Sequence, residues 1–129
     1  MPEASETRTV LIIEDEESVR SAIEAGLEVI GGYEVHSASD AVEGYRLLKE
    51  LQPDILLLDL VMPVTDGMEF LRMLGSDPDT AKPGKVVLMT AMTNPVPQGG
   101  MKALGLDLIL EKPFRLHQLA DAVGAESPF

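Results

Sequence analysis

The sequence predicts a single α/β domain built on a five-stranded parallel sheet with helices on both faces. Three observations predict this fold. β-rich runs alternate with segments in which apolar residues recur every three or four positions. The run at residues 55–58 is apolar throughout, as in a strand buried on both faces at the centre of a parallel sheet. Polar residues follow several of the runs, at the strand ends where open parallel sheets bind ligands.

The first strand and helix are predicted within residues 10–30. Residues 10–13 form a short apolar run that ends beside three acids. A helix is expected over Glu17–Ile30, and Gly31 and Gly32 end it because glycine is common at helix C-termini. The apolar face of this helix consists of Val19, Ile23, Leu27 and Ile30.

The second strand and helix precede the central run. Residues 33–37 form a brief second strand. Asp40 and Glu43 have the spacing of a capping pair at a helix N-terminus, and Pro53 stops the helix that follows. The side chains expected to point inward from this helix are those of Val42, Tyr45, Leu48 and Leu51.

The alternation continues after the central strand. Residues 75–84 contain two prolines and two glycines, which predicts a loop between a third helix and a fourth strand at residues 86–89. A fifth strand is expected at residues 106–110. The apolar residues that mark the third and the last helix are Met68, Leu71 and Leu74, and Leu116, Leu119, Ala120 and Val123, respectively.

The composition favours a cytoplasmic protein with a packed core. The sequence is 45% hydrophobic, and its lack of cysteine excludes disulfides and thiolate metal sites. Twenty-two acids against ten bases give a net charge of −12, which repels nucleic acids and anionic membranes. No run approaches the roughly 20 apolar residues of a membrane span. We therefore expect neither membrane insertion nor direct contact with nucleic acid.

Residues able to do chemistry follow four of the expected strands. Because parallel strands end at one edge of the sheet, we expect these residues to share a cleft. Close carboxylates repel each other, and a divalent cation that prefers oxygen ligands, such as Mg²⁺, relieves that repulsion. A carboxylate beside a metal and a lysine can attack a phosphoryl group and form an acyl phosphate. The residues concerned are Glu14, Asp15, Glu16, Asp59, Thr90 and Lys112.

Structural roles compete with this interpretation. Glu16 and Glu17 fit the N-terminus of the first helix, where the helix dipole favours negative charge. Asp59 taken alone is equally consistent with a loop cap. His36 and His117 lie in different elements without a paired ligand, so we expect both to be structural. The joint placement of acids, threonine and lysine at one sheet edge favours chemistry.

Four motifs resemble those of response-regulator receiver domains, over about residues 9–123. Residues 14–16 follow the strand V-L-I-I like the acidic pair of that family, and Thr90-Ala91 and Lys112-Pro113-Phe114 are similar to two later motifs. The resemblance implies a flavodoxin-like, doubly wound sheet with strand order 2-1-3-4-5. The strongest motif resembles D-x-x-M-P-x-x-D-G, the sequence around the phosphorylated aspartate of the family, and consists of Asp59, Met62, Pro63, Asp66 and Gly67.

The resemblance also implies roles for the site residues. Asp59 is implied to be the phosphorylation site. Thr90 and Lys112 each bind a phosphoryl oxygen, and the Lys112-Pro113 bond is expected to be cis. The implied Mg²⁺ ligands are Asp15 and Asp59 directly, Glu14 through water, and Val61 through its backbone carbonyl.

The sequence departs from the family pattern at three places. Glu14 stands where the family usually has aspartate, and the longer side chain is expected to keep the function. Ile109 replaces the usual tyrosine or phenylalanine, so the usual coupling between threonine and aromatic ring is not expected. Residues 94–100 read N-P-V-P-Q-G-G, which predicts a short, displaced or mobile fourth helix because proline and glycine are poor helix formers. Family members signal through the surface of the fourth helix, the fifth strand and the last helix. We expect this protein to signal differently there.

The resemblance implies a phospho-accepting receiver of a two-component or phosphorelay system. A sensor histidine kinase or histidine phosphotransfer protein would supply the phosphoryl group, and a downstream protein target would read the switched surface. We expect a receiver domain at residues 9–124 between tails at 1–8 and 125–129. It would catalyse its own phosphorylation and dephosphorylation without being a conventional enzyme. The end of the chain near Phe129 favours a receiver that stands alone, although a piece of a longer protein would look identical.

Two other functions fit parts of the sequence. A phosphatase with an aspartate nucleophile needs a second acid two residues after Asp59, and Val61 stands there instead. A receiver-like interaction module that works without phosphorylation is consistent with Ile109 and with residues 94–100. The retained acids, threonine and lysine argue against that module.

Overall fold

The structure is a computed structural model that describes residues 7–61, 67–91 and 108–124. Within these ranges five parallel strands form one sheet in the predicted order, β2-β1-β3-β4-β5. The strands are β1 (Arg8–Ile13), β2 (Tyr33–Ala38), β3 (Ile55–Asp59), β4 (Lys85–Ala91) and β5 (Leu108–Lys112). The helices are α1 (Glu17–Ile30), α2 (Ala41–Leu51), α3 (Gly67–Gly75) and α5 (Leu116–Gly124).

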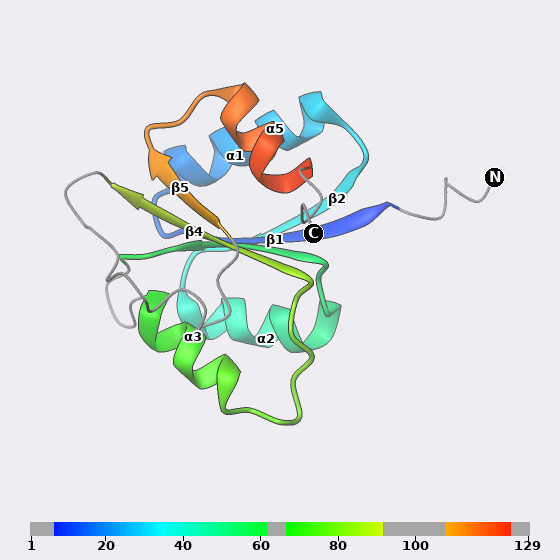
Figure 1. Cartoon of the computed structure of the whole chain (residues 1–129), viewed down its shortest axis with the longest axis vertical. Helices are drawn as coiled ribbons and strands as arrows, with labels where there is room; N and C mark the ends of the chain where they lie inside the picture. Colours follow the sequence, from blue (N-terminus) through cyan, green and yellow to red (C-terminus); the bar gives the residue numbers. More distant parts are fainter. Residues whose placement is uncertain (1–6, 62–66, 92–107, 125–129) are drawn as a thin grey trace.

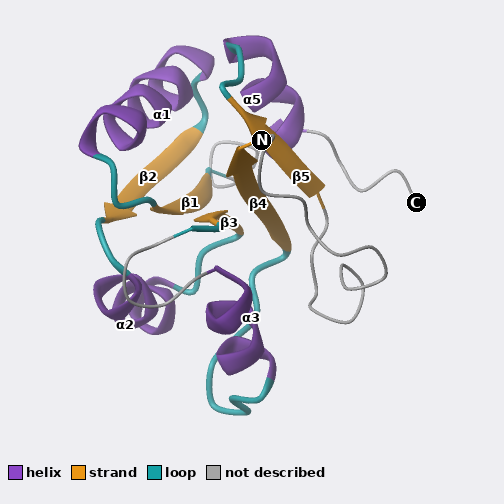
Figure 2. Ribbon diagram, turned by 90° about the vertical axis from the view of Figure 1, so that its left-hand side faces the viewer, coloured by secondary structure: helices purple, strands orange, loops and turns teal. Residues whose placement is uncertain are grey.

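The sheet is covered on both faces, and its core is therefore divided in two. Helices α1 and α5 lie on one face, and α2 and α3 lie on the other (Figures 1 and 2). Alternate residues of β1 serve the two halves: Val10 and Ile12 pack on the α1 and α5 side, and Leu11 and Ile13 on the α2 and α3 side. Strand β3 is buried at every position, as its apolar run predicts.

The structure contains the predicted helices, but the Val42 side chain on α2 does not point inward as expected. Helix α1 has the predicted bounds, and α2 begins after Asp40, whose side chain accepts a hydrogen bond of 2.8 Å from the Glu43 backbone N–H. Val42 was expected to point inward, but 79% of its surface is exposed. Gly44 and Leu48 form the buried face of α2, and Val42 lies off that face.

The strands extend somewhat further than their apolar runs predict. β1 begins at Arg8, inside the expected N-terminal tail, and β4 spans Lys85–Ala91. β5 runs on to Lys112, and the Lys112-Pro113 peptide bond is cis, as expected. Several expectations concern positions outside the described residues, namely those for Met62, Pro63, Asp66, the start of the fifth strand at residue 106, the segment 94–100, the C-terminal tail and most of the N-terminal tail.

Two glycines bring helices close to the sheet. A Cβ atom at Gly44 would lie 2.5 Å from Cδ1 of Ile13, and one at Gly67 would lie 2.6 Å from the backbone oxygen of Asp59. The Gly67 backbone N–H also donates to the Leu60 carbonyl at 2.7 Å. Glycine at position 67 therefore lets α3 start directly against the end of β3, where Asp59 lies.

Candidate functional site

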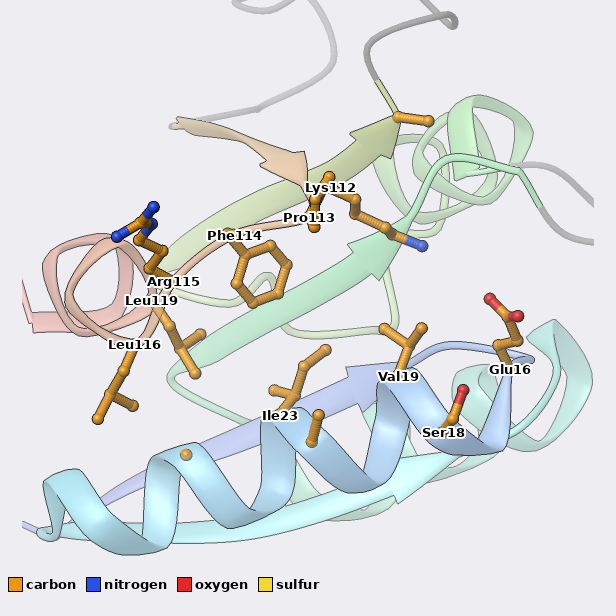
Figure 3. A pocket seen from close by; sticks show the side chains of 13 residues that line it. Glu16, Ser18, Val19, Ile23, Lys112, Pro113, Phe114, Arg115, Leu116 and Leu119 are labelled. Carbon is orange, nitrogen blue, oxygen red and sulfur yellow. The ribbon is translucent and has the colours of Figure 1, made fainter.

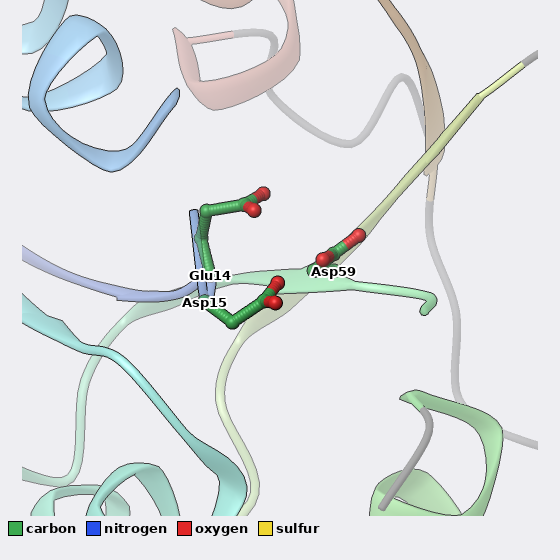
Figure 4. Close-up of side chains that lie close together, drawn as sticks. All are labelled: Glu14, Asp15 and Asp59. Carbon is green, nitrogen blue, oxygen red and sulfur yellow. The ribbon is translucent and has the colours of Figure 1, made fainter. Parts of the chain in front are cut away.

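Three carboxylates meet at the C-terminal ends of β1 and β3. The two strands pair in register, with Ile13 opposite Leu58, so Glu14, which follows β1, lies beside Asp59, the last residue of β3. Glu14, Asp15 and Asp59 face a common space in Figure 4, and each offers a carboxylate oxygen within 4.8 Å of the others. The predicted convergence of these acids is thus found in the structure.

Lys112 reaches the same site from the end of β5. Its ammonium donates to Glu14 Oε1 at 2.8 Å and to Asp59 Oδ1 at 3.0 Å. Both acids are buried, with 1% of Glu14 and 4% of Asp59 exposed. Burial alone lowers the pKa of Lys112, but the hydrogen bonds and charges of the two acids outweigh it and raise the pKa. Lys112 therefore stays protonated and neutralises buried negative charge.

The site is short of positive charge without a metal. Burial first, and the charge of Glu14 with it, raise the pKa of Asp59 to about 6, against the lowering effect of Lys112 and of the Val61 backbone N–H. The cluster has three carboxylates, and the Lys112 ammonium pairs with two of them, Glu14 and Asp59. All the ligand atoms are oxygen, and the Asp15 side chain is exposed, which leaves room for water on an ion. These properties fit Mg²⁺.

Backbone N–H groups of the segment between β1 and α1 bind β2 and the Glu14 side chain. The Glu14 N–H donates to the Ala38 carbonyl of β2 at 3.1 Å, and the Glu16 N–H donates to Glu14 Oε2 at 3.1 Å. Glu16 is the residue before the first turn of α1, which confirms its expected place at the helix N-terminus. Both carboxylate oxygens of Glu14 are thus bound, one to Lys112 and one to Glu16.

Thr90 and Val61 lie beside Asp59. Thr90 is 5% exposed and follows Met89, the residue that pairs with Asp59 across β3 and β4. Its hydroxyl donates to the Ala91 carbonyl at 3.1 Å. The Val61 N–H donates to Asp59 Oδ1 at 3.4 Å, and its side chain is 54% exposed. The roles predicted for the Thr90 hydroxyl and the Val61 carbonyl stay predictions.

The two histidines lie apart from this site. His36 in β2 pairs with Glu34 at 2.7 Å, and His117 is exposed on α5. Neither residue belongs to the acid cluster, and their expected structural roles stay predictions.

An apolar cavity of about 600 Å³ lies next to the site, between α1 and α5 (Figure 3). Lys112 belongs to its lining, but none of the three clustered acids does. The acid cluster therefore lies outside this cavity. Its apolar walls consist mainly of Val19, Ile23, Phe114, Leu116 and Leu119.

Arg20 is a site neighbour that the sequence reasoning missed. Its guanidinium Nη1 donates to the Glu14 backbone carbonyl at 2.9 Å. One feature of the sequence could have pointed to Arg20: it is the one basic residue between Glu17 and Ile30. The contact itself depends on how the chain turns from β1 into α1, which apolar periodicity does not specify.

The fold and the site together define the class of α/β domains that carry an acid cluster and a lysine at the ends of a doubly wound sheet. The chain belongs to the response regulator receiver domain family, whose model matches residues 10–124.

Relatives of known identity agree with this assignment. The chain is 33% identical over 116 residues to the DNA-binding dual master transcriptional regulator RpaA of Synechocystis sp., covering 90% of this chain and 47% of that protein. It is also 33% identical over 110 residues to the response regulator MprA of Mycobacterium avium, covering 85% of this chain and 46% of that protein. The chain thus spans about half the length of the curated relatives it matches.

Solved structures agree as well. The chemotaxis protein CheY4 of Vibrio cholerae is 29% identical, with a TM-score of 0.74 over 91% of this chain and 96% of that one. A CheY-like receiver domain protein from Methanospirillum hungatei is 26% identical, with a TM-score of 0.72 over 88% of each chain.

The family assignment carries a general function. Receiver domains accept a phosphoryl group in two-component signalling, bind Mg²⁺ at an acidic pocket, interact with histidine kinases or phosphotransfer proteins, and are not enzymes in the usual sense. Because some relatives are named as transcriptional or DNA-binding regulators, the comparisons do not support the expectation of no contact with nucleic acid. None of the helices in the described part of the chain combines the length and apolar character that a bilayer crossing requires.

Proposed function

We propose that Asp59 is the phospho-acceptor of this receiver domain and that Lys112 and a Mg²⁺ ion together neutralise the negative charge of the transferred phosphoryl group. The observation that supports this most is the pair of contacts from the Lys112 ammonium to Asp59 Oδ1 and Glu14 Oε1, at 3.0 Å and 2.8 Å. They put a nucleophilic carboxylate, a cation and an acid cluster at one point.

Four residues would hold the Mg²⁺ ion. Asp15 and Asp59 bind it directly, and Val61 contributes its backbone carbonyl. Glu14 acts through water, because Lys112 and the Glu16 N–H already bind its two oxygens. When bound, the ion supplies positive charge against the phosphoryl oxygens and lowers the repulsion among the carboxylates.

Asp59 is the nucleophile. One of its carboxylate oxygens forms a bond to the phosphorus of a phosphohistidine while the phosphorus–nitrogen bond breaks and its electron pair stays on the imidazole nitrogen. Lys112 pairs with one phosphoryl oxygen and the Thr90 hydroxyl donates to another. Later, water attacks the phosphorus, which releases inorganic phosphate and restores the carboxylate. The chain thus catalyses its own phosphorylation and dephosphorylation.

The phosphoryl group then biases a surface between two states, and a downstream protein reads that surface. A cytoplasmic sensor histidine kinase or histidine phosphotransfer protein is the donor. Ile109, which is 36% exposed on β5, stands in place of an aromatic switch residue, so the response runs without a ring that turns inward. The outward position of Ile109 supports this part of the proposal.

Intact-mass measurement tests the proposed function. The protein is incubated with Mg²⁺ and acetyl phosphate, and we expect a gain of one phosphoryl group that is lost in Asp59→Asn and after removal of Mg²⁺ with EDTA. Asp54→Asn is the matched control, because Asp54 lies at the opposite end of β3 and contacts Thr9. An unmodified wild-type protein with an intact fold would favour an interaction module that works without phosphate.

A further inference from the structure

Arg20 contacts the acidic segment between β1 and α1 through its side chain. Its guanidinium Nη1 donates to the Glu14 carbonyl at 2.9 Å, whereas its backbone N–H makes the regular helical hydrogen bond to the carbonyl of Glu16, the N-cap residue, at 2.9 Å. Arg20 is half-buried and lies in the first turns of α1. Its side chain therefore reaches back over the helix N-terminus to the residue next to Asp15.

The Glu14 carbonyl is a sensitive point of this segment. It belongs to the peptide unit that joins Glu14 to Asp15, and a peptide unit is planar. Rotation of this plane moves the Asp15 backbone and swings its carboxylate. Glu14 follows Ile13, the last residue of β1; its N–H still donates to the Ala38 carbonyl of β2, and its carbonyl accepts from Arg20. A charged donor to a carbonyl in this position fixes the direction of the plane.

We propose that Arg20 is a positioning residue for the metal site: by binding the Glu14 carbonyl, it holds the Glu14–Asp15 peptide so that the Asp15 carboxylate faces Asp59. The proposal rests on the proposed function in that Asp15 and Asp59 share a Mg²⁺ ion. Figure 4 shows the Asp15 carboxylate pointing toward Asp59, and Arg20 acts on Asp15 through the backbone.

The direction in which Mg²⁺ affinity changes when Arg20 is replaced distinguishes a positioning contact from a purely electrostatic effect. The guanidinium carries a positive charge close to the acid cluster, and a charge alone repels a divalent cation. Removing only a charge would therefore tighten metal binding. Removing a positioning contact would weaken it, because supporting contacts typically contribute about tenfold or more to metal affinity.

The test compares Arg20→Met with Arg46→Met in the complete chain. Both variants lose one positive charge, but Arg46 lies on α2 and pairs with Glu43 and Glu50. Mg²⁺ affinity is measured by calorimetry without a phosphodonor. We expect Arg20→Met to bind Mg²⁺ about tenfold more weakly and Arg46→Met to bind it as the wild type does. Equal or tighter binding by Arg20→Met would overturn the proposal.

Three further readouts exclude general damage to the fold. In metal-free protein, the Asp15 and Glu16 amides should exchange hydrogen faster in Arg20→Met, while the amides of β3 keep their protection. Arg20→Lys keeps a donor and the charge, so it should recover part of the affinity. At saturating Mg²⁺ the phosphorylation rate of Arg20→Met should return to within about twofold of wild type, since a contact that acts on metal binding does not change the later step.

The outcomes also separate this inference from the proposed function. If the wild type binds Mg²⁺ but takes no phosphoryl group, and Arg20→Met binds the ion more weakly, the proposed function fails and the positioning role stands. If Asp59 is phosphorylated normally and Arg20→Met keeps wild-type Mg²⁺ affinity, the positioning role alone fails. A loss of rate that persists at saturating Mg²⁺, with unchanged affinity, would also overturn it.

Discussion

The Lys112 ammonium lies 3.0 Å from Asp59 Oδ1, although the two residues are 53 positions apart in the sequence. β4 lies between β3 and β5 in the sheet, and the long side chain of Lys112 spans the distance between these two strands. The same ammonium binds Glu14, so one cation is shared by two buried carboxylates. In the proposed function, this arrangement places positive charge beside Asp59 before any phosphoryl group arrives.

Lys112→Met should lose about 100-fold in the rate of phosphorylation by acetyl phosphate, because it removes a preorganised cation from the transferred oxygens. The rate is followed by intact mass at saturating Mg²⁺. Lys49→Met is the charge-matched control, since Lys49 is exposed on α2 and lies over the Tyr45 ring. A Lys112→Met protein that is phosphorylated as fast as the control would refute the role of Lys112.

Asp15→Asn should separate metal binding from stability. We expect Mg²⁺ affinity to fall by at least about tenfold, because a direct carboxylate ligand is lost. The metal-free variant should melt at a higher temperature than metal-free wild type, because one of three mutually repelling carboxylates has been neutralised. Calorimetric titration and thermal melts in EDTA measure the two effects. The exposed acid Asp121 on α5 supplies the control variant, Asp121→Asn. A lower melting temperature in Asp15→Asn would contradict this account.

Much of this architecture can be predicted from local patterns in the sequence. The all-apolar run of β3 gives its central place, and the Asp40 cap and the amphipathic face of α1 follow from spacing alone. The acids and Lys112 were found because topology brings parallel strand ends to one edge.

Other features depend on tertiary packing that spacing does not specify. Val42 was predicted to point inward because it is apolar, yet it is exposed. The buried face of α2 is determined by Gly44, which packs so closely against Ile13 that a Cβ would not fit. The sharing of Lys112 between two acids and the reach of Arg20 to a backbone carbonyl depend on side-chain conformations at the strand ends. Hydrophobic patterns carry no information about such contacts.

Gly67→Ala should destabilise the protein by about 1–3 kcal/mol, because the new methyl group meets backbone that must move. Its Cβ would lie 2.6 Å from the Asp59 carbonyl oxygen. The control is Gly75→Ala at the other end of α3, where a Cβ meets nothing within 4 Å. Urea unfolding compares the two variants. Equal stabilities would show that α3 does not need this close approach to the end of β3.

Asp77 should make the stability of the loop after α3 depend on pH. The Thr80 hydroxyl and the Tyr45 hydroxyl each donate to Asp77 Oδ2 at 2.7 Å, and the Asp79 N–H donates to Oδ1 at 3.0 Å. These three hydrogen bonds, that of Thr80 foremost, lower the pKa of Asp77 from 3.8 to about 2. The ionised carboxylate is therefore favoured in the folded state.

The sign of the pH dependence follows from this lowered pKa. The folded protein binds fewer protons at Asp77 than the unfolded chain between pH 3.8 and about 2, so its contribution is complete above pH 3.8 and is lost as the pH falls toward 2. Asp77→Asn should be less stable than wild type at pH 6, and the difference should shrink over that acidic range. Urea unfolding from pH 6 to pH 2 measures it, with Asp79→Asn as a control in the same loop. A gap between wild type and Asp77→Asn that stays constant down to pH 2 would show that the Asp77 charge does not hold Tyr45 and Thr80 in place.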